Sequence, residues 1–136
     1  MDNSIQKITF EENSKKRVLA IDDNASMRTF LYDALSFLGF EVVAAGSGAD
    51  GFEQFIQNSF DLVITDCQMP GMDGWQLASL VKKVSTRTPV IMVTGQDEYA
   101  VMDKMQNSDI DHMMFKPFKL DDFYTTVRAS LENKLI

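Results

Sequence analysis

The chain has 136 residues, of which 45% are apolar and 24% are charged, as expected for one globular domain. Twenty Asp and Glu residues against thirteen Lys and Arg give a net charge of −7, which argues against binding to nucleic acid or to an anionic membrane surface. No apolar run reaches the ~20 residues of a transmembrane helix, and the polar first sixteen residues lack the apolar stretch of a signal peptide. The single cysteine, Cys67, permits no intrachain disulfide, so we expect a protein of the reducing cytoplasm.

Two hydrophobic patterns alternate from Arg17 onward, after a polar extension over residues 1–16. Short, continuously apolar runs are typical of parallel strands that are covered on both faces. Between these runs, apolar residues recur at the spacing of one helix face. In chain order we predict strands at 18–21, 42–45, 62–64, 90–93 and 113–115, each followed by a helix, near 27–38, 52–56, 77–81, 101–105 and 120–131.

This order of elements predicts an α/β fold in which a strand and a helix alternate five times, within one domain over residues 17–136. Such alternation implies a parallel sheet with helices on both faces, joined by right-handed crossovers. Reactive or charged side chains follow four of the five strands, and the exception is the second strand. We therefore expect a doubly wound, flavodoxin-like sheet in the order 2-1-3-4-5, in which the second strand lies at the far edge from the ligand crevice.

Three carboxylates are expected to meet at the carboxyl edge of this sheet, because Asp22 and Asp23 follow the first strand and Asp66 follows the third. Carboxylates that lie so close repel one another unless a cation neutralises them. A hard divalent ion suits such oxygen ligands, and we predict Mg²⁺, with Mn²⁺ as an alternative. Lys116 after the fifth strand and Thr94 at the end of the fourth would complete a phosphoryl-transfer site in which Asp66 is the nucleophile.

Four motifs lie around these strand ends: VLAIDDN at 18–24, DLVITDCQMPGMDG at 61–74, PVIMVTG at 89–95 and FKPF at 115–118. In this order, and over residues 17–135, the sequence resembles the receiver domain of two-component response regulators. The resemblance implies that Asp66 accepts a phosphoryl group from a phosphohistidine. The donor would be a sensor histidine kinase or a histidine phosphotransfer protein. It also implies that the domain is a switch rather than an enzyme, because the Asp66 carboxylate is consumed by phosphorylation and regenerated by dephosphorylation.

The resemblance assigns metal ligands residue by residue. Asp23 and Asp66 would bind Mg²⁺ directly, together with the backbone carbonyl of Gln68. Asp22 would act mostly through a metal-bound water. The family also holds the peptide bond between Lys116 and the following proline in the cis form, which X–Pro bonds tolerate.

A switching mechanism is implied as well. Thr94 and Lys116 would contact the phosphoryl oxygens, and the face built from the fourth helix, fifth strand and fifth helix would repack to bind a downstream protein. The family's switch aromatic lies three residues before the lysine, but this chain has Met113 there, whose thioether lacks the ring and hydroxyl of tyrosine. Gln68 and Gln96 occupy positions that flank the attacking water, so we expect their side chains to tune the lifetime of the acyl phosphate.

Other interpretations of the sequence remain open. A pseudo-receiver would bind partners without accepting phosphate. A phosphatase of the haloacid dehalogenase type would carry D-x-D after the first strand, where this chain has Asp22-Asp23-Asn24, and FMN binding would need a hydroxyl-rich loop there. Residues 46–51 match G-x-G-x-x-G, but they follow the second strand, so we interpret them as a helix start capped by Ser47. Cys67 is expected to pack as a small apolar side chain, and His112 to be structural.

Overall fold

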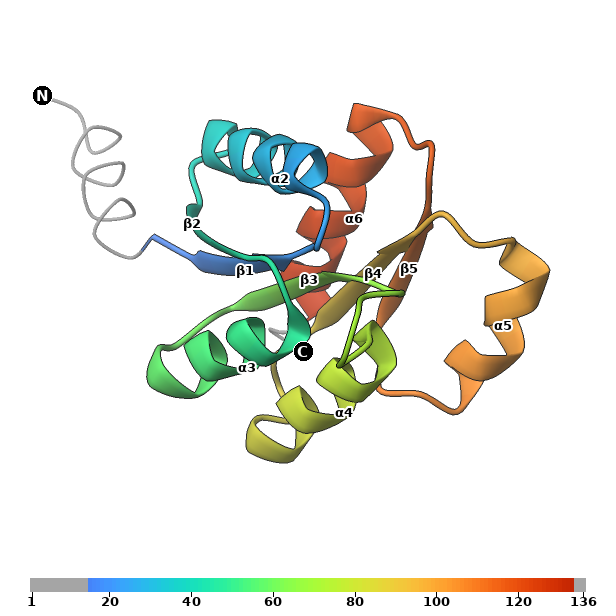
Figure 1. Ribbon diagram of the computed structural model, residues 1–136. Helices are drawn as coiled ribbons and strands as arrows, with labels where there is room; N and C mark the ends of the chain where they lie inside the picture. Colours follow the sequence, from blue (N-terminus) through green and yellow to red (C-terminus); the bar gives the residue numbers. More distant parts are fainter. Residues whose placement is uncertain (1–14, 134–136) are drawn as a thin grey trace, which may run out of the picture.

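The computed structural model describes residues 15–133, so the expected polar extension over 1–16 falls, except for its last two residues, outside the described residues. Over the described range, strands and helices alternate as predicted (Figure 1). None of the helices in this range is long and apolar enough to cross a membrane. The elements are β1 (Arg17–Ile21), α2 (Ala25–Phe37), β2 (Glu41–Ala45), α3 (Gly48–Gln57), β3 (Leu62–Asp66), α4 (Gly74–Val84), β4 (Val90–Thr94), α5 (Glu98–Gln106), β5 (His112–Phe115) and α6 (Leu120–Asn133).

The five strands form one parallel sheet in the order β2-β1-β3-β4-β5, which confirms the predicted topology. The apolar runs of β1, β3 and β4 are almost completely buried, because helices cover both faces of the sheet. Ile21 pairs with Thr65, and Asp66 pairs with Val93. This register brings the carboxyl ends of the three central strands to one edge.

Two apolar layers separate the sheet from its helices. On one face, α2 and α6 contribute Leu35 and the fully buried Phe123, and on the other face α3 and α4 contribute Phe55 and Leu77 (Figure 1). Each such side chain stabilises the fold by about 1.5–3 kcal/mol when it leaves water completely. The core therefore holds the sheet rigidly beneath the loops that follow the strands.

The helix starts are fixed by side-chain caps. Ser47 accepts the N–H of Asp50 at the start of α3, which confirms the interpretation of residues 46–51 as a capped helix start. At the start of α4, Asp73 and Gln76 form a reciprocal capping box. Loss of one such cap costs about 1 kcal/mol, and the caps also fix where each loop enters its helix.

Helix α5 packs less closely than its apolar spacing predicted. Val101 is buried, but Met102 is 38% exposed and Tyr99 is 90% exposed. Met105 is partly buried against the core. In Figure 1, α5 stands beside the β5 edge of the sheet, apart from the other helices. The predicted apolar stripe over 101–105 is thus confirmed fully only for Val101.

Candidate functional site

Three carboxylates meet at the carboxyl edge of the sheet. One ligand atom each from Asp22, Asp23 and Asp66 lies within 4.8 Å of the other two. Asp22 directly follows β1 and Asp66 ends β3, and the pairing of these strands places the two residues side by side. Asp22 is only 1% exposed, whereas Asp23 is exposed to solvent. The cluster is therefore buried at Asp22 and open to water at Asp23.

One ammonium group faces this cluster. The Nζ atom of Lys116 lies 3.6 Å from Oδ2 of Asp22 and 3.8 Å from Oδ1 of Asp66. A single cation among three carboxylates leaves an excess of negative charge. Carboxylate oxygens at these separations are the donor set that a hard divalent cation prefers, so the residues fit the predicted metal. Gln68, the further predicted ligand, lies in the loop after β3 with its side chain exposed.

The carboxylate of Asp66 is held in place by the backbone. The N–H of Cys67 donates a hydrogen bond of 2.7 Å to Oδ1 of Asp66. Burial raises the pKa of Asp66 above its ordinary value of 3.8, and the charge of Asp22 raises it further. The Cys67 N–H and the Lys116 ammonium lower this pKa, and the charge of Asp23 raises it slightly more. A cation bound beside Asp66 would favour its ionised form and offset the effect of burial and of Asp22.

A glycine allows the loop after β3 to fold back under Asp66. The N–H of Gly74 donates a 2.8 Å hydrogen bond to the carbonyl of Cys67. A Cβ atom at Gly74 would collide with the backbone carbonyl of Asp66 and would come within 2.8 Å of the Met92 methyl group. Glycine at this position therefore lets α4 begin directly against the strand that carries the candidate nucleophile.

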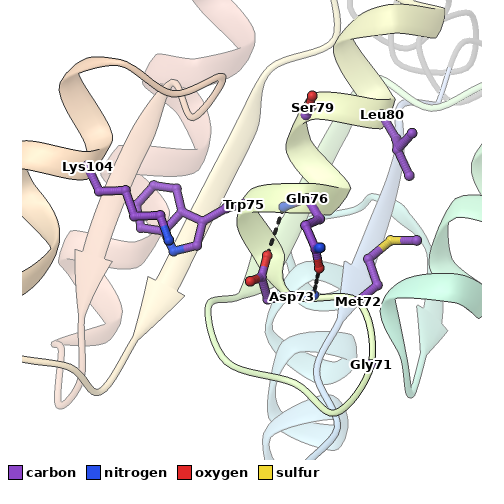
Figure 2. Close-up of a pocket in the computed structure, with 8 residues that line it drawn as sticks. All are labelled: Gly71, Met72, Asp73, Trp75, Gln76, Ser79, Leu80 and Lys104. Atoms are coloured by element: carbon purple, nitrogen blue, oxygen red, sulfur yellow. Dashed lines mark hydrogen bonds between the residues drawn. The ribbon is translucent and has the colours of Figure 1, made fainter.

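Figure 2 shows the start of α4, with its capping box between Asp73 and Gln76, beside an open surface depression. From the same turn, the ring of Trp75 reaches α5, where the Lys104 ammonium lies 5.1 Å from the ring centroid. A cation–π contact of this kind contributes about 0.5–1 kcal/mol at an exposed site. It connects the first turn of α4 to the loosely packed helix α5.

The strand ends of β4 and β5 present Thr94 and Lys116 to the same edge. Thr94 is 1% exposed, and its hydroxyl oxygen accepts a 3.0 Å hydrogen bond from the N–H of Gln96. The backbone N–H of Lys116 donates to the carbonyl of Thr94 at 2.8 Å, and the Lys116–Pro117 bond is cis, as the resemblance implied. Met113, the predicted switch position, is partly buried against the core.

Two further contacts at this site were also not predicted from the sequence. The thiol of Cys67 donates a 3.2 Å hydrogen bond to Oε1 of Gln96, although Cys67 is otherwise buried as expected. The guanidinium of Arg28 donates a 2.8 Å hydrogen bond from Nη1 to the backbone carbonyl of Asp22. Arg28 lies outside the apolar stripe of its helix, and its helix position alone does not indicate which carbonyl it reaches. Gly46 is the sequence feature that could have indicated this contact, because the missing side chain leaves space for the guanidinium of Arg28.

Comparison with known proteins gives three consistent results. Residues 18–128 match the family model described as the response regulator receiver domain. The transcriptional regulatory protein HprR of Escherichia coli K12 is 30% identical over 115 residues, which cover 85% of this chain and 51% of HprR. The sensor histidine kinase RcsC of Salmonella typhi is 29% identical over 124 residues, which cover 91% of this chain and 13% of RcsC. The chain thus spans about half of the regulator and a small part of the kinase.

Solved structures show the same fold. A CheY-like receiver domain protein from Methanospirillum hungatei superposes with a TM-score of 0.83 at 26% identity, covering 88% of this chain and 96% of that one. The response regulator TrrA from Thermotoga maritima, solved in complex with Mg²⁺-BeF, superposes with a TM-score of 0.78 at 28% identity, covering 85% and 99%. Since the family model covers most of the chain and the fold agrees, this protein belongs to the response regulator receiver domain family of two-component systems.

Proposed function

We propose that this receiver domain is the phosphoacceptor of a two-component phosphorelay and that Asp66 is the residue phosphorylated. The observation that carries this proposal is the arrangement around Asp66. Its partly exposed carboxylate lies 3.8 Å from the Lys116 ammonium and within ligand distance of Asp22 and Asp23. A nucleophilic oxygen, a cation for the phosphoryl oxygens and a metal-binding pair are therefore at one edge of the sheet.

In the proposed reaction a carboxylate oxygen of Asp66 attacks the phosphorus of a phosphohistidine. The new P–O bond forms as the P–N bond breaks, and the imidazole leaves with the electron pair of that bond. Lys116 and the hydroxyl of Thr94 contact the phosphoryl oxygens and stabilise their charge. Hydrolysis of the acyl phosphate later restores the carboxylate, so the domain acts as a switch and not as an enzyme.

The proposed metal is Mg²⁺, with Mn²⁺ as an alternative. Asp23, Asp66 and the carbonyl of Gln68 would hold it directly, and Asp22 through a water. Bound there, it would supply the positive charge that three carboxylates and one ammonium lack. The carboxylate cluster supports this assignment, as does the structure of TrrA, which was solved in complex with Mg²⁺-BeF.

The proposed partners follow from the same chemistry. A sensor histidine kinase or a histidine phosphotransfer protein would donate the phosphoryl group, and the relatives RcsC and HprR are a sensor kinase and a transcriptional regulatory protein. A downstream protein would bind the face formed by α5, β5 and α6. Weak packing of α5 supports this choice, because an element with few buried side chains repacks at low cost.

Intact-mass spectrometry tests the proposal. The protein is incubated with Mg²⁺ and acetyl phosphate, beside an Asp66→Asn variant and an EDTA control. We expect the wild type to gain the mass of one phosphoryl group, and both controls to gain none. An adduct of equal yield in the Asp66→Asn variant would refute Asp66 as the acceptor.

The same experiment addresses the pseudo-receiver alternative. A protein that forms no adduct with acetyl phosphate and binds neither Mg²⁺ nor beryllofluoride would act only through protein contacts. Asp22, Asp23, Asp66, Thr94 and Lys116 are all present at one edge of the sheet, which favours the phosphoacceptor. The family assignment also separates this chain from the haloacid dehalogenase phosphatases and the FMN-binding flavodoxins.

A further inference from the structure

The glycine-rich segment 46–51 lies next to the acidic site, although it binds no nucleotide in the function proposed above. Each glycine of the segment leaves room for a neighbouring residue, and a Cβ atom at any of the three would crowd that residue. The closest approaches would be 3.2 Å from Gly46 to Nη1 of Arg28, 2.8 Å from Gly48 to the carbonyl oxygen of Met72, and 2.5 Å from Gly51 to Cδ1 of Ile21.

Arg28 is the member of this set that reaches the acidic residues directly. It lies on the second turn of α2, half-buried, and its Nη1 atom donates a 2.8 Å hydrogen bond to the carbonyl oxygen of Asp22. The N–H of Asp22 donates in turn to the carbonyl of Ala45 at the end of β2. Both backbone groups of Asp22 are thus held, one by the sheet and one by Arg28. Gly46, the next residue after Ala45, completes the seat of the guanidinium.

We propose that Arg28, seated against Gly46, positions the acidic pair for metal binding. Fixing the Asp22 carbonyl fixes the direction in which the chain leaves β1, and therefore where the carboxylates of Asp22 and Asp23 lie relative to Asp66. Arg28 contacts no metal ligand atom, so it acts as a positioning residue. The inference rests on the proposed function, because it concerns Mg²⁺ binding at that same site.

The sign of the effect separates positioning from charge. Arg28 carries a positive charge near a site for a cation, so by charge alone its removal tightens Mg²⁺ binding. Loss of positioning acts in the opposite direction, because residues that orient metal ligands contribute about 10–100-fold to affinity. Gly46→Ala changes no charge, and the atoms within 4 Å of the added Cβ all belong to the Arg28 guanidinium. The substitution adds no backbone strain, because the φ angle of Gly46 lies outside the left-handed region. Weaker binding in both variants therefore has one common explanation.

Isothermal titration with Mg²⁺ of the wild type, Gly46→Ala, Arg28→Ala and the double variant tests the inference. We expect Arg28→Ala to weaken binding about tenfold, the low end of that range, and Gly46→Ala to weaken it by a smaller factor. In the Arg28→Ala background, Gly46→Ala should add nothing, because no guanidinium remains to be displaced. Arg87→Ala serves as the matched control, because it removes one positive charge from an exposed residue outside the carboxylate cluster.

The outcomes distinguish the inference from the function on which it rests. Urea unfolding of each variant establishes that it is folded under the titration conditions. Unchanged or tighter Mg²⁺ binding in folded Arg28→Ala would overturn the inference while leaving the proposed function intact. A full additional loss from Gly46→Ala in the double variant would overturn the coupling between the two residues. A wild type that binds no Mg²⁺ would instead contradict the proposed function itself.

Discussion

Replacing Asp66 by Asn should stabilise the metal-free protein, although it removes the candidate nucleophile. Ligand atoms of the three carboxylates lie within 4.8 Å of one another, a separation at which two unit charges interact by about 3.5 kcal/mol for an effective dielectric constant of about 20. The attraction of Lys116 at 3.8 Å is about 4.4 kcal/mol on the same scale. Ionised Asp66 therefore faces two repulsions and one attraction, a net repulsion of about 2–3 kcal/mol. Because Asp23 is exposed and screened by water, we expect a gain of about 1–2 kcal/mol in the free energy of unfolding.

Urea denaturation at pH 7 in EDTA measures this gain. Asn has nearly the shape of Asp, and its amide oxygen can still accept the Cys67 N–H, so the comparison isolates the charge. Saturating Mg²⁺ should shrink or reverse the difference, because an ion that binds only the folded state stabilises the wild type by RT ln(1 + [Mg²⁺]/Kd). The free energy of unfolding should therefore depend on Mg²⁺ far more strongly in the wild type than in Asp66→Asn.

The pH dependence has a defined sign. Since burial and Asp22 raise the pKa of Asp66 in the folded state, the folded protein binds this proton more tightly than the unfolded chain does. The stability contributed by the proton is complete below the ordinary value of 3.8 and is lost as the pH rises through the raised pKa. The advantage of Asp66→Asn should thus be absent in acid and should grow as the pH rises through the raised pKa. Equal or lower stability of Asp66→Asn at pH 7 in EDTA would refute the electrostatic reasoning.

Four further substitutions have defined outcomes. Gln96→Ala and Gln68→Ala should change the rate at which the acyl phosphate is lost, measured as phosphoprotein remaining after donor removal, because the family resemblance implies that both side chains flank the attacking water. Unchanged rates would contradict this role. Asp111→Ala should lower the free energy of unfolding in urea by about 1–3 kcal/mol, because it leaves the buried N–H of Val90, now bonded at 2.7 Å, without its carboxylate partner. Phe123→Ala should lower it by about 3–5 kcal/mol, since Phe123 is fully buried.

The strands and their order were predictable because two independent features of the sequence agree. The continuous apolar run 18–21 indicates a strand covered on both faces, and the structure buries all four residues completely. The absence of charged side chains after the second strand indicates an edge position, which β2 occupies. Once the strand order is known, parallel pairing brings Asp22 and Asp66 to the same edge. The carboxylate cluster could therefore be predicted from the sequence alone.

The features that were not predicted depend on contacts between elements that are distant in the sequence. The hydrophobic periodicity of one element carries no information about such contacts. Val101 and Met102 are adjacent in one apolar run, yet only Val101 is buried, because consecutive helical residues point about 100° apart and Val101 shares its face with Met105, which packs against the core. The hydrogen bond between Cys67 and Gln96 joins the loops that follow β3 and β4, and the register of these two strands determines which loop residues lie side by side. Arg28 was not identified, because a polar helix position gives no indication of which backbone carbonyl it will reach.

The charge balance of the site suggests two roles for a metal in the proposed phosphorylation, one during the transfer and one in the phosphorylated product. Three carboxylates and one ammonium leave a net charge of about −2 before any reaction. A phosphoryl group carries about −1.5 to −2 at neutral pH and would replace one carboxylate charge, so the product is more negative than the starting site. An ion held by these carboxylates would supply positive charge to the phosphoryl oxygens during transfer and would also stabilise the phosphorylated state afterwards. Backbone N–H groups of Asn24 and Cys67 donate to the carboxylates of Asp22 and Asp66, so hydrogen bonds within the protein already hold both side chains in place for an incoming cation.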